Sequence, residues 1–112
     1  MPLFYRTTLT GAGTAAATVT SWFPLNQFET PFNVGFGVVI GAAASGKFAV
    51  QHTFDDVFDT SVTPTAFDHS TVSGKSANID GNYAFAVSAI RLRIASASGN
   101  DSFTIIARQV GI

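Results

Sequence analysis

The stretch FNVGFGVVI, residues 32–40, decides the fold class, because apolar residues alternate in it with small or polar ones. Successive side chains of a β-strand point to opposite faces, so this alternation predicts a strand with one buried face. The apolar face carries Phe32, Val34, Phe36, Val38 and Ile40, and the opposite face carries Asn33, Gly35 and Gly37. No segment of ten residues or more shows helical spacing instead.

The same alternation appears on both sides of this stretch. In KFAVQHTF, residues 47–54, the residues Phe48, Val50 and Phe54 share one face, and DSFTIIARQ, residues 101–109, alternates in the same way. LFYRTTLT (3–10) and TAAATVTSW (14–22) are weaker candidates, rich in Thr and Ala. Each of these segments is predicted to form a short strand.

YAFAVSAIRLRIAS, residues 83–96, changes its pattern midway. Phe85 and Val87 share one parity, whereas Ile90, Leu92 and Ile94 share the other. A single strand that keeps its apolar face inward must absorb one extra residue at such a change. The pattern therefore predicts a β-bulge at about residues 88–89.

The expected architecture is all-β. Glycines punctuate the alternating runs, and six to eight short antiparallel strands in one domain, residues 1–112, predict a β-sandwich with a jelly-roll-like arrangement. A small closed barrel is the alternative. Residues 55–82 form the one long stretch without a clear pattern, and a stretch of this kind in a compact domain is expected to be functional or to pack as an excursion from the domain.

The composition excludes several classes of function. The net charge of −1 and the six scattered basic residues argue against nucleic-acid binding, and the chain has no cysteine for a disulfide or thiolate site. The N-terminus does not have the pattern of a signal peptide, and no apolar run approaches the length of about 18 residues needed to span a membrane. We therefore expect a soluble protein made in the cytoplasm, with no membrane partner.

The low charge is the most unusual compositional feature. Charged residues make up 12% of the chain, against about 25% in a typical soluble domain. One explanation is a small β-domain with a hydroxyl-rich exterior. The other is a protein that spends its life bound to other proteins, since the centres of interfaces are depleted in charge and enriched in aromatic residues.

Two motifs resemble cofactor or metal sites without completing them. GAAASGKF, residues 41–48, lacks the Ser or Thr that follows the lysine of a phosphate-binding loop, and a strand pattern follows it, so a hairpin turn is expected. The acidic residues of VQHTFDDVFDTSVTPTAFDH, residues 50–69, lack the spacing and the glycine of a calcium loop, and two histidines are too few for zinc. No metal and no cofactor is expected.

The two histidines are expected to be structural. His52 has the inward parity of Phe48 and Val50, so a hydrogen bond to Asp55 or Asp56 would pin the start of the loop, and His69 would do the same at its other end. No nucleophile with a base oriented toward it can be identified. The chain is therefore not expected to be an enzyme.

The charges are unevenly distributed. Residues 55–80 contain five aspartates and one lysine, a balance of −4, whereas the rest of the chain carries five basic residues against Glu29 and Asp101, a balance of +3. The aspartates could simply keep a long loop solvated. An acidic loop on a mildly basic body also suits docking between protein copies, because opposite charges set the register of an interface.

Three segments give the chain a resemblance to a known family. VQHTFDD (50–56), TPTAFDH (63–69) and DGNYAFAVSAIRL (80–92) resemble capsid decoration proteins of short-tailed bacteriophages, also called cement or staple proteins. The resemblance covers about residues 32–95. It implies a β-sandwich or jelly roll that binds the outer surface of the major capsid protein lattice on the virion and clamps neighbouring capsomers. It implies no catalytic or cofactor residue.

Together these observations predict a docking or self-association loop, and the alternative is that its two phenylalanine rings pack against the domain's own core. Phe58 and Phe67 would be its anchors and the polar residues its rim, so the predicted interface residues are Asp55, Asp56, Phe58, Asp59, Phe67, Asp68 and His69. The expected partners are the major capsid protein and further copies of the chain in a dimer or trimer. The alternatives are a tail- or fibre-associated protein and a carbohydrate-binding β-sandwich.

Overall fold

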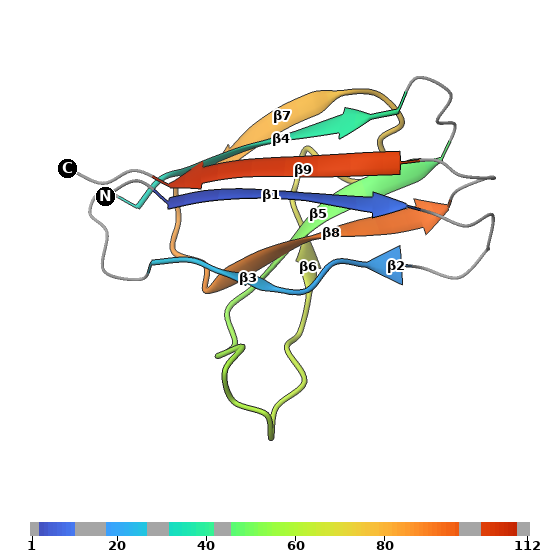
Figure 1. Ribbon diagram of the computed structural model, residues 1–112. Coiled ribbons are helices and arrows are strands. Elements are labelled where there is room, and N and C mark those ends of the chain that lie inside the picture. Colours follow the sequence, from blue (N-terminus) through green and yellow to red (C-terminus); the bar gives the residue numbers. More distant parts are fainter. Residues whose placement is uncertain (1–2, 11–17, 27–31, 42–45, 97–101, 110–112) are drawn as a thin grey trace.

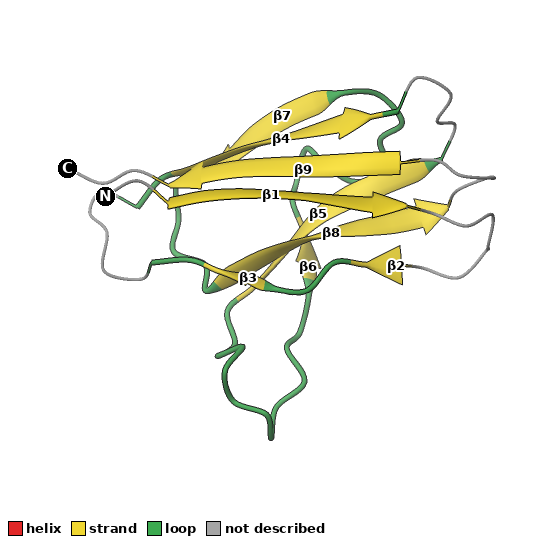
Figure 2. Ribbon diagram, in the orientation of Figure 1, coloured by secondary structure: helices red, strands yellow, loops and turns green. Residues whose placement is uncertain are grey.

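A computed structural model describes residues 3–10, 18–26, 32–41, 46–96 and 102–109. This part of the chain consists of strands and loops (Figure 2), and within it no helix is long and apolar enough to cross a membrane. The strands are β1 (Leu3–Thr10), β2 (Thr18–Val19), β3 (Phe23–Pro24), β4 (Val34–Ile40), β5 (Lys47–Thr53), β6 (Phe67–Asp68), β7 (Ile79–Tyr83), β8 (Ala89–Ser96) and β9 (Ser102–Gln109).

The strands form two antiparallel sheets (Figure 1). The order in the first, the β4 sheet, is β1-β9-β4-β7, and the order in the second, the β5 sheet, is β2-β8-β5-β6, with β3 also paired to β8. Side chains of both sheets meet in one core, as where the rings of Phe48 on β5 and Phe103 on β9 lie 5.7 Å apart. The chain is therefore a β-sandwich, as predicted, and not a single closed barrel.

The pairing of the strands is nested. β1 pairs with β9, β2 and β3 pair with β8, β4 pairs with β7, and β5 pairs with β6. Because β2 and β3 lie along the same neighbour, they act as one interrupted strand. When β2 and β3 are counted as one strand, the first strand pairs with the last, the second with the second-last, and so on inward. The four pairs are divided between two sheets of four strands, which is the arrangement of a jelly roll.

The core follows from the alternation in β4. Val34, Phe36 and Val38 are buried, whereas Gly35 and Val39 on the opposite face are exposed. β9 of the same sheet and β8 of the facing sheet contribute their own alternate residues to the same core, among them Phe103, Ile105 and Ala107 from β9 and Ile90, Leu92 and Ile94 from β8. The prediction made from residues 32–40 is confirmed.

The prediction of one bulged strand over residues 83–96 is wrong. Tyr83 ends β7 in the β4 sheet and Ala89 begins β8 in the β5 sheet, so the intervening residues cross from one sheet to the other. The parity changes because two strands in different sheets each turn their own apolar face inward. A register shift does occur in β8, but opposite Lys47 and Phe48, whose partners are Ser96 and Ile94.

Residues 55–82 are less irregular than expected. They contain β6 and most of β7, whose segment IDGNY pairs with β4 from Val34 to Val38. Asp, Gly and Asn are typical of turns, so this edge strand has no clear signal in the sequence. Pairing with an already ordered neighbour overrides that local preference.

The segment GAAASGKF does not form the hairpin turn expected of it. Residues 42–45 lie outside the described residues, but β4 before them and β5 after them belong to different sheets. The segment therefore connects the two sheets. The strand predicted after it is confirmed, since β5 begins at Lys47.

The first prediction compares two glycines. A Cβ atom on Gly81 would lie 2.9 Å from Cζ of Phe36 and 3.3 Å from Cε1 of His69, whereas one on Gly35 would meet nothing within 4 Å. Because both rings at Gly81 are packed, we expect Gly81→Ala to lower the free energy of unfolding by about 1–3 kcal/mol. Gly35→Ala should leave it unchanged or raise it by about 0.5–1 kcal/mol. Denaturant unfolding measures both, and equal effects of the two substitutions would contradict the packing described.

Candidate protein-binding surface

Three phenylalanine rings lie together, partly exposed to solvent, where β5 and β7 end. Phe54, Phe67 and Phe85 are 58%, 48% and 52% exposed. The ring centroid of Phe54 lies 5.8 Å from that of Phe67 and 6.4 Å from that of Phe85. We call these three residues the aromatic patch. Clustered apolar side chains on a surface are typical of binding sites.

The strands place these rings although the residues are far apart in sequence. Phe54 follows the last residue of β5, Phe85 lies two residues beyond β7, and Phe67 opens β6 opposite His52. Directly opposite residues in a sheet share a face, so Phe67 lies on the interior side, as His52 does. The patch is thus an extension of the core to the surface.

His52 supports the patch from below. Its ring centroid lies 5.5, 5.9 and 5.6 Å from those of Phe54, Phe67 and Phe85. Its Nδ1 makes a 2.9 Å hydrogen bond with the hydroxyl of Tyr83, which is fully buried. His52 is on the β5 sheet and Tyr83 is on the β4 sheet, so this bond joins the two sheets beneath the patch.

Burial sets the protonation of this pair. Loss of hydration, and to a smaller extent the nearby His69, hold the pKa of His52 below its usual value of 6.5, although Asp68 acts in the opposite direction. Burial, with a smaller contribution from Asp68, raises the pKa of Tyr83 above its usual range. Both side chains are therefore uncharged at neutral pH.

The expected histidine–aspartate hydrogen bonds do not form. His52 is buried, as predicted, but its partner is Tyr83 because its ring points between the sheets and not toward the loop. His69 accepts a 3.2 Å hydrogen bond from the backbone N–H of Thr71 at Nδ1, so its Nε2 donates to the carbonyl oxygen of Asn82 at 2.9 Å. The interface role of His69 stays a prediction, and its ring, 8% exposed, offers little surface to a partner.

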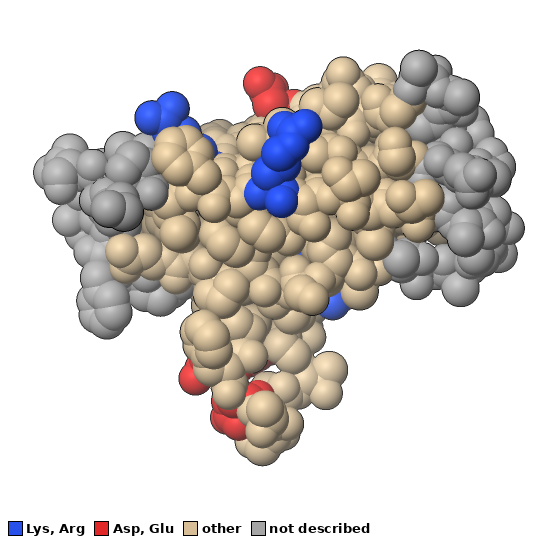
Figure 3. Space-filling model, in the orientation of Figure 1, with Lys and Arg blue, Asp and Glu red and all other residues tan. Residues whose placement is uncertain are grey.

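The loop of residues 54–66 projects from the body of the sandwich (Figure 1). Its aspartates accept hydrogen bonds from the backbone: Asp55 from Thr65 at 2.7 Å, Asp56 from Phe58 at 2.9 Å, and Asp59 from Ser61 at 3.0 Å. The hydroxyl of Ser61 also donates to Asp59, and the two bonds from Ser61 lower the pKa of that carboxyl. The acidic residues seen on the projection in Figure 3 therefore give the loop a defined shape.

Phe58 is the most exposed large apolar side chain of the described residues, at 76%. It borders a hollow of about 230 Å³ at the base of the loop, whose lining is mostly apolar. The hollow is lined by Pro24, Leu25, Phe54, Asp56, Val57, Phe58 and Ser88. Phe54 belongs to both the hollow and the aromatic patch, so the apolar surface continues from the patch to the loop.

Asp68 lies on a different face from the patch. It pairs in register with Gln51, whose Nε2 donates to it at 2.8 Å, and the hydroxyl of Ser73 donates to its second oxygen at 2.7 Å. The bond from Gln51, followed by that from Ser73, outweighs burial and lowers the pKa of Asp68. Because neighbouring residues of a strand point to opposite faces, the side chains of Phe67 and Asp68 lie on opposite faces of β6, and the interface role of Asp68 stays a prediction.

The structure thus places the predicted interface residues on more than one surface. It brings Phe67 together with two rings that sequence reasoning had assigned to buried strand faces, Phe54 and Phe85. Phe54 was expected to point into the core, but β5 ends at Thr53 and leaves its ring uncovered. The four phenylalanines within residues 54–85 are a compositional sign of a binding surface, but the sequence does not show which of their rings remain exposed. No group of three or more potential metal ligands occurs among the described residues.

Comparisons with known proteins support the fold. No protein-family model matches the sequence, and no curated protein matches it significantly. The structure is similar to the crystal structure of the SPBc2 prophage-derived protein YomS, with a TM-score of 0.51, 13% identity and 95% of each chain covered. At this identity the similarity shows a shared fold, and the resemblance to capsid decoration proteins stays a prediction.

A second structural match is more distant. It is to a structure of Bacillus endospore appendages that form disulfide-linked pili, with a TM-score of 0.42, 12% identity, and 99% of this chain and 89% of that chain covered. That TM-score is too low to indicate a shared fold.

The second prediction concerns pH. Because the pKa of His52 is lower in the folded protein than its usual 6.5, the unfolded chain binds a proton first as the pH falls. The free energy of unfolding should therefore decrease between about pH 7 and 5. The His52→Gln variant should lose stability at neutral pH but show a smaller decrease over this range, since one titrating group is removed. Unfolding curves across this range measure the effect, and identical slopes would contradict it.

Proposed function

We propose that this protein is a structural component of a bacteriophage particle that binds other proteins through the aromatic patch and the loop of residues 54–66. In this proposal it decorates the capsid, binding the outer surface of the major capsid protein lattice and clamping neighbouring capsomers. It carries out no catalysis and needs no cofactor.

The observation that carries the proposal is the exposure of Phe54, Phe58, Phe67 and Phe85 on one continuous apolar surface. Leaving apolar area in water is unfavourable by roughly 25 cal/mol per Å², so such a surface is explained if a partner covers it. Aromatic residues are also enriched at the energetic centres of protein interfaces.

The loop adds a second argument, because its shape is fixed before any partner binds. The hydrogen bonds made by Asp55, Asp56 and Asp59 hold the backbone on both sides of Phe58. A loop that is already ordered loses less conformational entropy on binding, so more of the contact energy appears as affinity. Phe58 is thus suited to enter a pocket on the partner.

The fold and the structural neighbour agree with a phage role. Jelly rolls recur in viral capsid and lectin domains, and one protein of similar structure is described as prophage-derived. The low charge of the chain also suits a domain that is bound to protein for most of its life. A capsid offers the same binding site many times, and a clamp that engages two neighbouring subunits gains avidity from the linkage of its contacts.

The third prediction tests attachment to the particle. Mass spectrometry of purified virions of the phage that encodes this chain should find it in many copies. Because Phe58 is 76% exposed, Phe58→Ala should change the free energy of unfolding by no more than about 0.5 kcal/mol. It should nevertheless weaken binding to capsids that lack the protein by about 2 kcal/mol or more, which is roughly thirtyfold.

Two further variants complete that experiment. Phe67→Ala should also weaken capsid binding, with a moderate loss of stability because the ring packs on His52. Phe4→Ala is the matched control, since this ring is 64% exposed on the outer face of β1, away from the aromatic patch, and the substitution should leave attachment unchanged. Absence of the chain from virions, or full attachment of both Phe58→Ala and Phe67→Ala, would refute the docking proposal.

The fourth prediction concerns self-association. An exposed apolar patch can pair with its own copy around a symmetry axis, so the protein should form a dimer or a trimer when concentrated. Sedimentation velocity over a range of concentrations measures the association. Replacing Phe85, which packs on Phe54 at the surface of the patch, with Ala should shift the equilibrium toward monomer. A wild-type protein that stays monomeric at all concentrations would contradict the prediction.

A further inference from the structure

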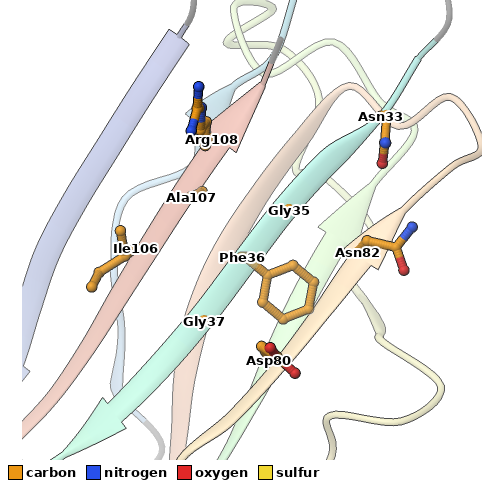
Figure 4. Close-up of a pocket in the computed structure, with 9 residues that line it drawn as sticks. All are labelled: Asn33, Gly35, Phe36, Gly37, Asp80, Asn82, Ile106, Ala107 and Arg108. Carbon is orange, nitrogen blue, oxygen red and sulfur yellow. The ribbon is translucent and has the colours of Figure 1, made fainter.

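The outer face of the β4 sheet carries an open furrow of about 710 Å³. Its floor is formed by Gly35 and Gly37 of β4, which present no side chain (Figure 4). In register with these glycines, β7 places Asn82 and Asp80 on one side, and β9 places Arg108 and Ile106 on the other. The furrow is therefore a strip of bare backbone between two rows of side chains.

The structure gives no packing reason for these two glycines. Gly81 is required, because a Cβ there would meet Phe36, and Gly74 has a φ of 64°, which favours glycine. A Cβ on Gly35 would meet nothing within 4 Å, and one on Gly37 would make only ordinary contacts at 3.9 Å. Neither of the two has a positive φ.

Glycine at such positions has a cost. In the interior of a strand it is less stable than Ala by roughly 0.5–1 kcal/mol, and β4 is a central strand paired on both sides. A glycine within a strand often marks a place where a ligand or another backbone approaches closely. Two glycines on the same face of one strand keep a continuous path open for such an approach.

The shape of the furrow fits one extended polymer chain. A second, smaller hollow of about 380 Å³ shares Gly37, Asp80 and Ile106 with the furrow and continues it to Val39. From Asn33 to Val39 the strand rises by roughly 20 Å, and β7 and β9 lie about 10 Å apart, twice the spacing of neighbouring strands.

The polar groups of the furrow indicate what kind of chain would bind. The backbone of β4 is already hydrogen-bonded to β7 and to β9 from Val34 to Val38, so the floor cannot add a peptide as a new strand. The remaining groups are side chains: the carboxylate of Asp80 accepts, the guanidinium of Arg108 donates, and the amide of Asn82 does both. Among the lining residues one negative and one positive charge balance, with Arg6 of β1 lying beyond Ile106 outside the furrow, and this balance favours a neutral ligand over a polyanion.

From this geometry we propose that the furrow binds a neutral polysaccharide chain laid along β4. Sugar hydroxyls donate and accept hydrogen bonds along both edges of the chain, as the two rows of side chains require. Ile106 provides an apolar contact for a ring face. This site is separate from the aromatic patch, which lies on the interior side of the strands where β5 and β7 end.

The test uses neutral hexasaccharides, namely maltohexaose, cellohexaose and fully N-acetylated chitohexaose, titrated into the isotope-labelled protein. At least one of them should shift the backbone amide signals of Gly35, Gly37 and Asn82 in NMR spectra. Gly35→Val fills the furrow and should weaken that binding by about tenfold or more, with a melting temperature unchanged or raised. Arg108→Gln should weaken it as well, whereas Thr8→Val, an exposed position on β1 of the same sheet, should leave it unchanged.

Three outcomes would overturn the proposal. The first is the absence of shifts at these amides for all three sugars at concentrations of about 10 mM, and the second is undiminished binding by Gly35→Val. The third is an equal or larger shift with a neutral Gly-Ser peptide of similar length, which would assign the furrow to a peptide. Phe85→Ala should not affect sugar binding and Gly35→Val should not affect attachment to capsids, so the failure of one proposal is distinguishable from that of the other.

Discussion

The hydrogen bond between His52 and Tyr83 is the contact on which the proposed binding surface depends. It lies in the interior, between side chains from opposite sheets, where the core reaches solvent. A buried polar group without a partner costs roughly 1–3 kcal/mol, so each of these residues requires the other. By fixing the His52 ring, the bond also fixes the three phenylalanine rings that pack on it. The rigidity of the surface therefore comes from the core beneath it.

The aspartates of residues 55–80 also stabilise the proposed binding surface, through hydrogen bonds within the loop. Five aspartates in residues 55–80 appear in the sequence as a charged region, and in the structure four of them accept hydrogen bonds from nearby backbone or side chains. Asp56 and Asp59 accept from the backbone N–H two residues on, as in Asx turns, which allow a loop to keep its shape without a hydrophobic core of its own. The carboxylates thus hold Phe58 in place, and any role at the rim of an interface is additional.

Strand β7 connects the two proposed sites. Its inward residue Tyr83 supports the aromatic patch, and its outward residues Asp80 and Asn82 line the furrow. Gly81 lies between the latter two, where the ring of Phe36 leaves no space for a side chain. A short edge strand of five residues thus contributes to the proposed protein-binding surface and to the proposed polysaccharide-binding furrow, on different sides of the molecule.

The sequence by itself determined the fold class and the inward faces of the long strands. The period of two in residues 34–40 and 102–109, together with the Ile90, Leu92 and Ile94 series, was sufficient because a strand with one buried face needs only local alternation. The absence of helical spacing and the glycines between the alternating runs predicted short antiparallel strands, and such strands pack as a sandwich. Phe58 and Phe67 were also identified from the sequence as aromatic residues of a loop with an unusual composition.

The tertiary structure decided the rest. It decided that residues 83–96 form two strands in two sheets, that IDGNY is a strand, and that Phe54 remains exposed. It also decided that the partner of His52 is Tyr83, 31 residues away, and not a neighbouring aspartate. Alternation indicates which side chains share a face. It does not indicate which strand packs on that face, or which residues at its end stay exposed. That depends on pairing between distant segments, whose energy is gained only when the whole sandwich has formed.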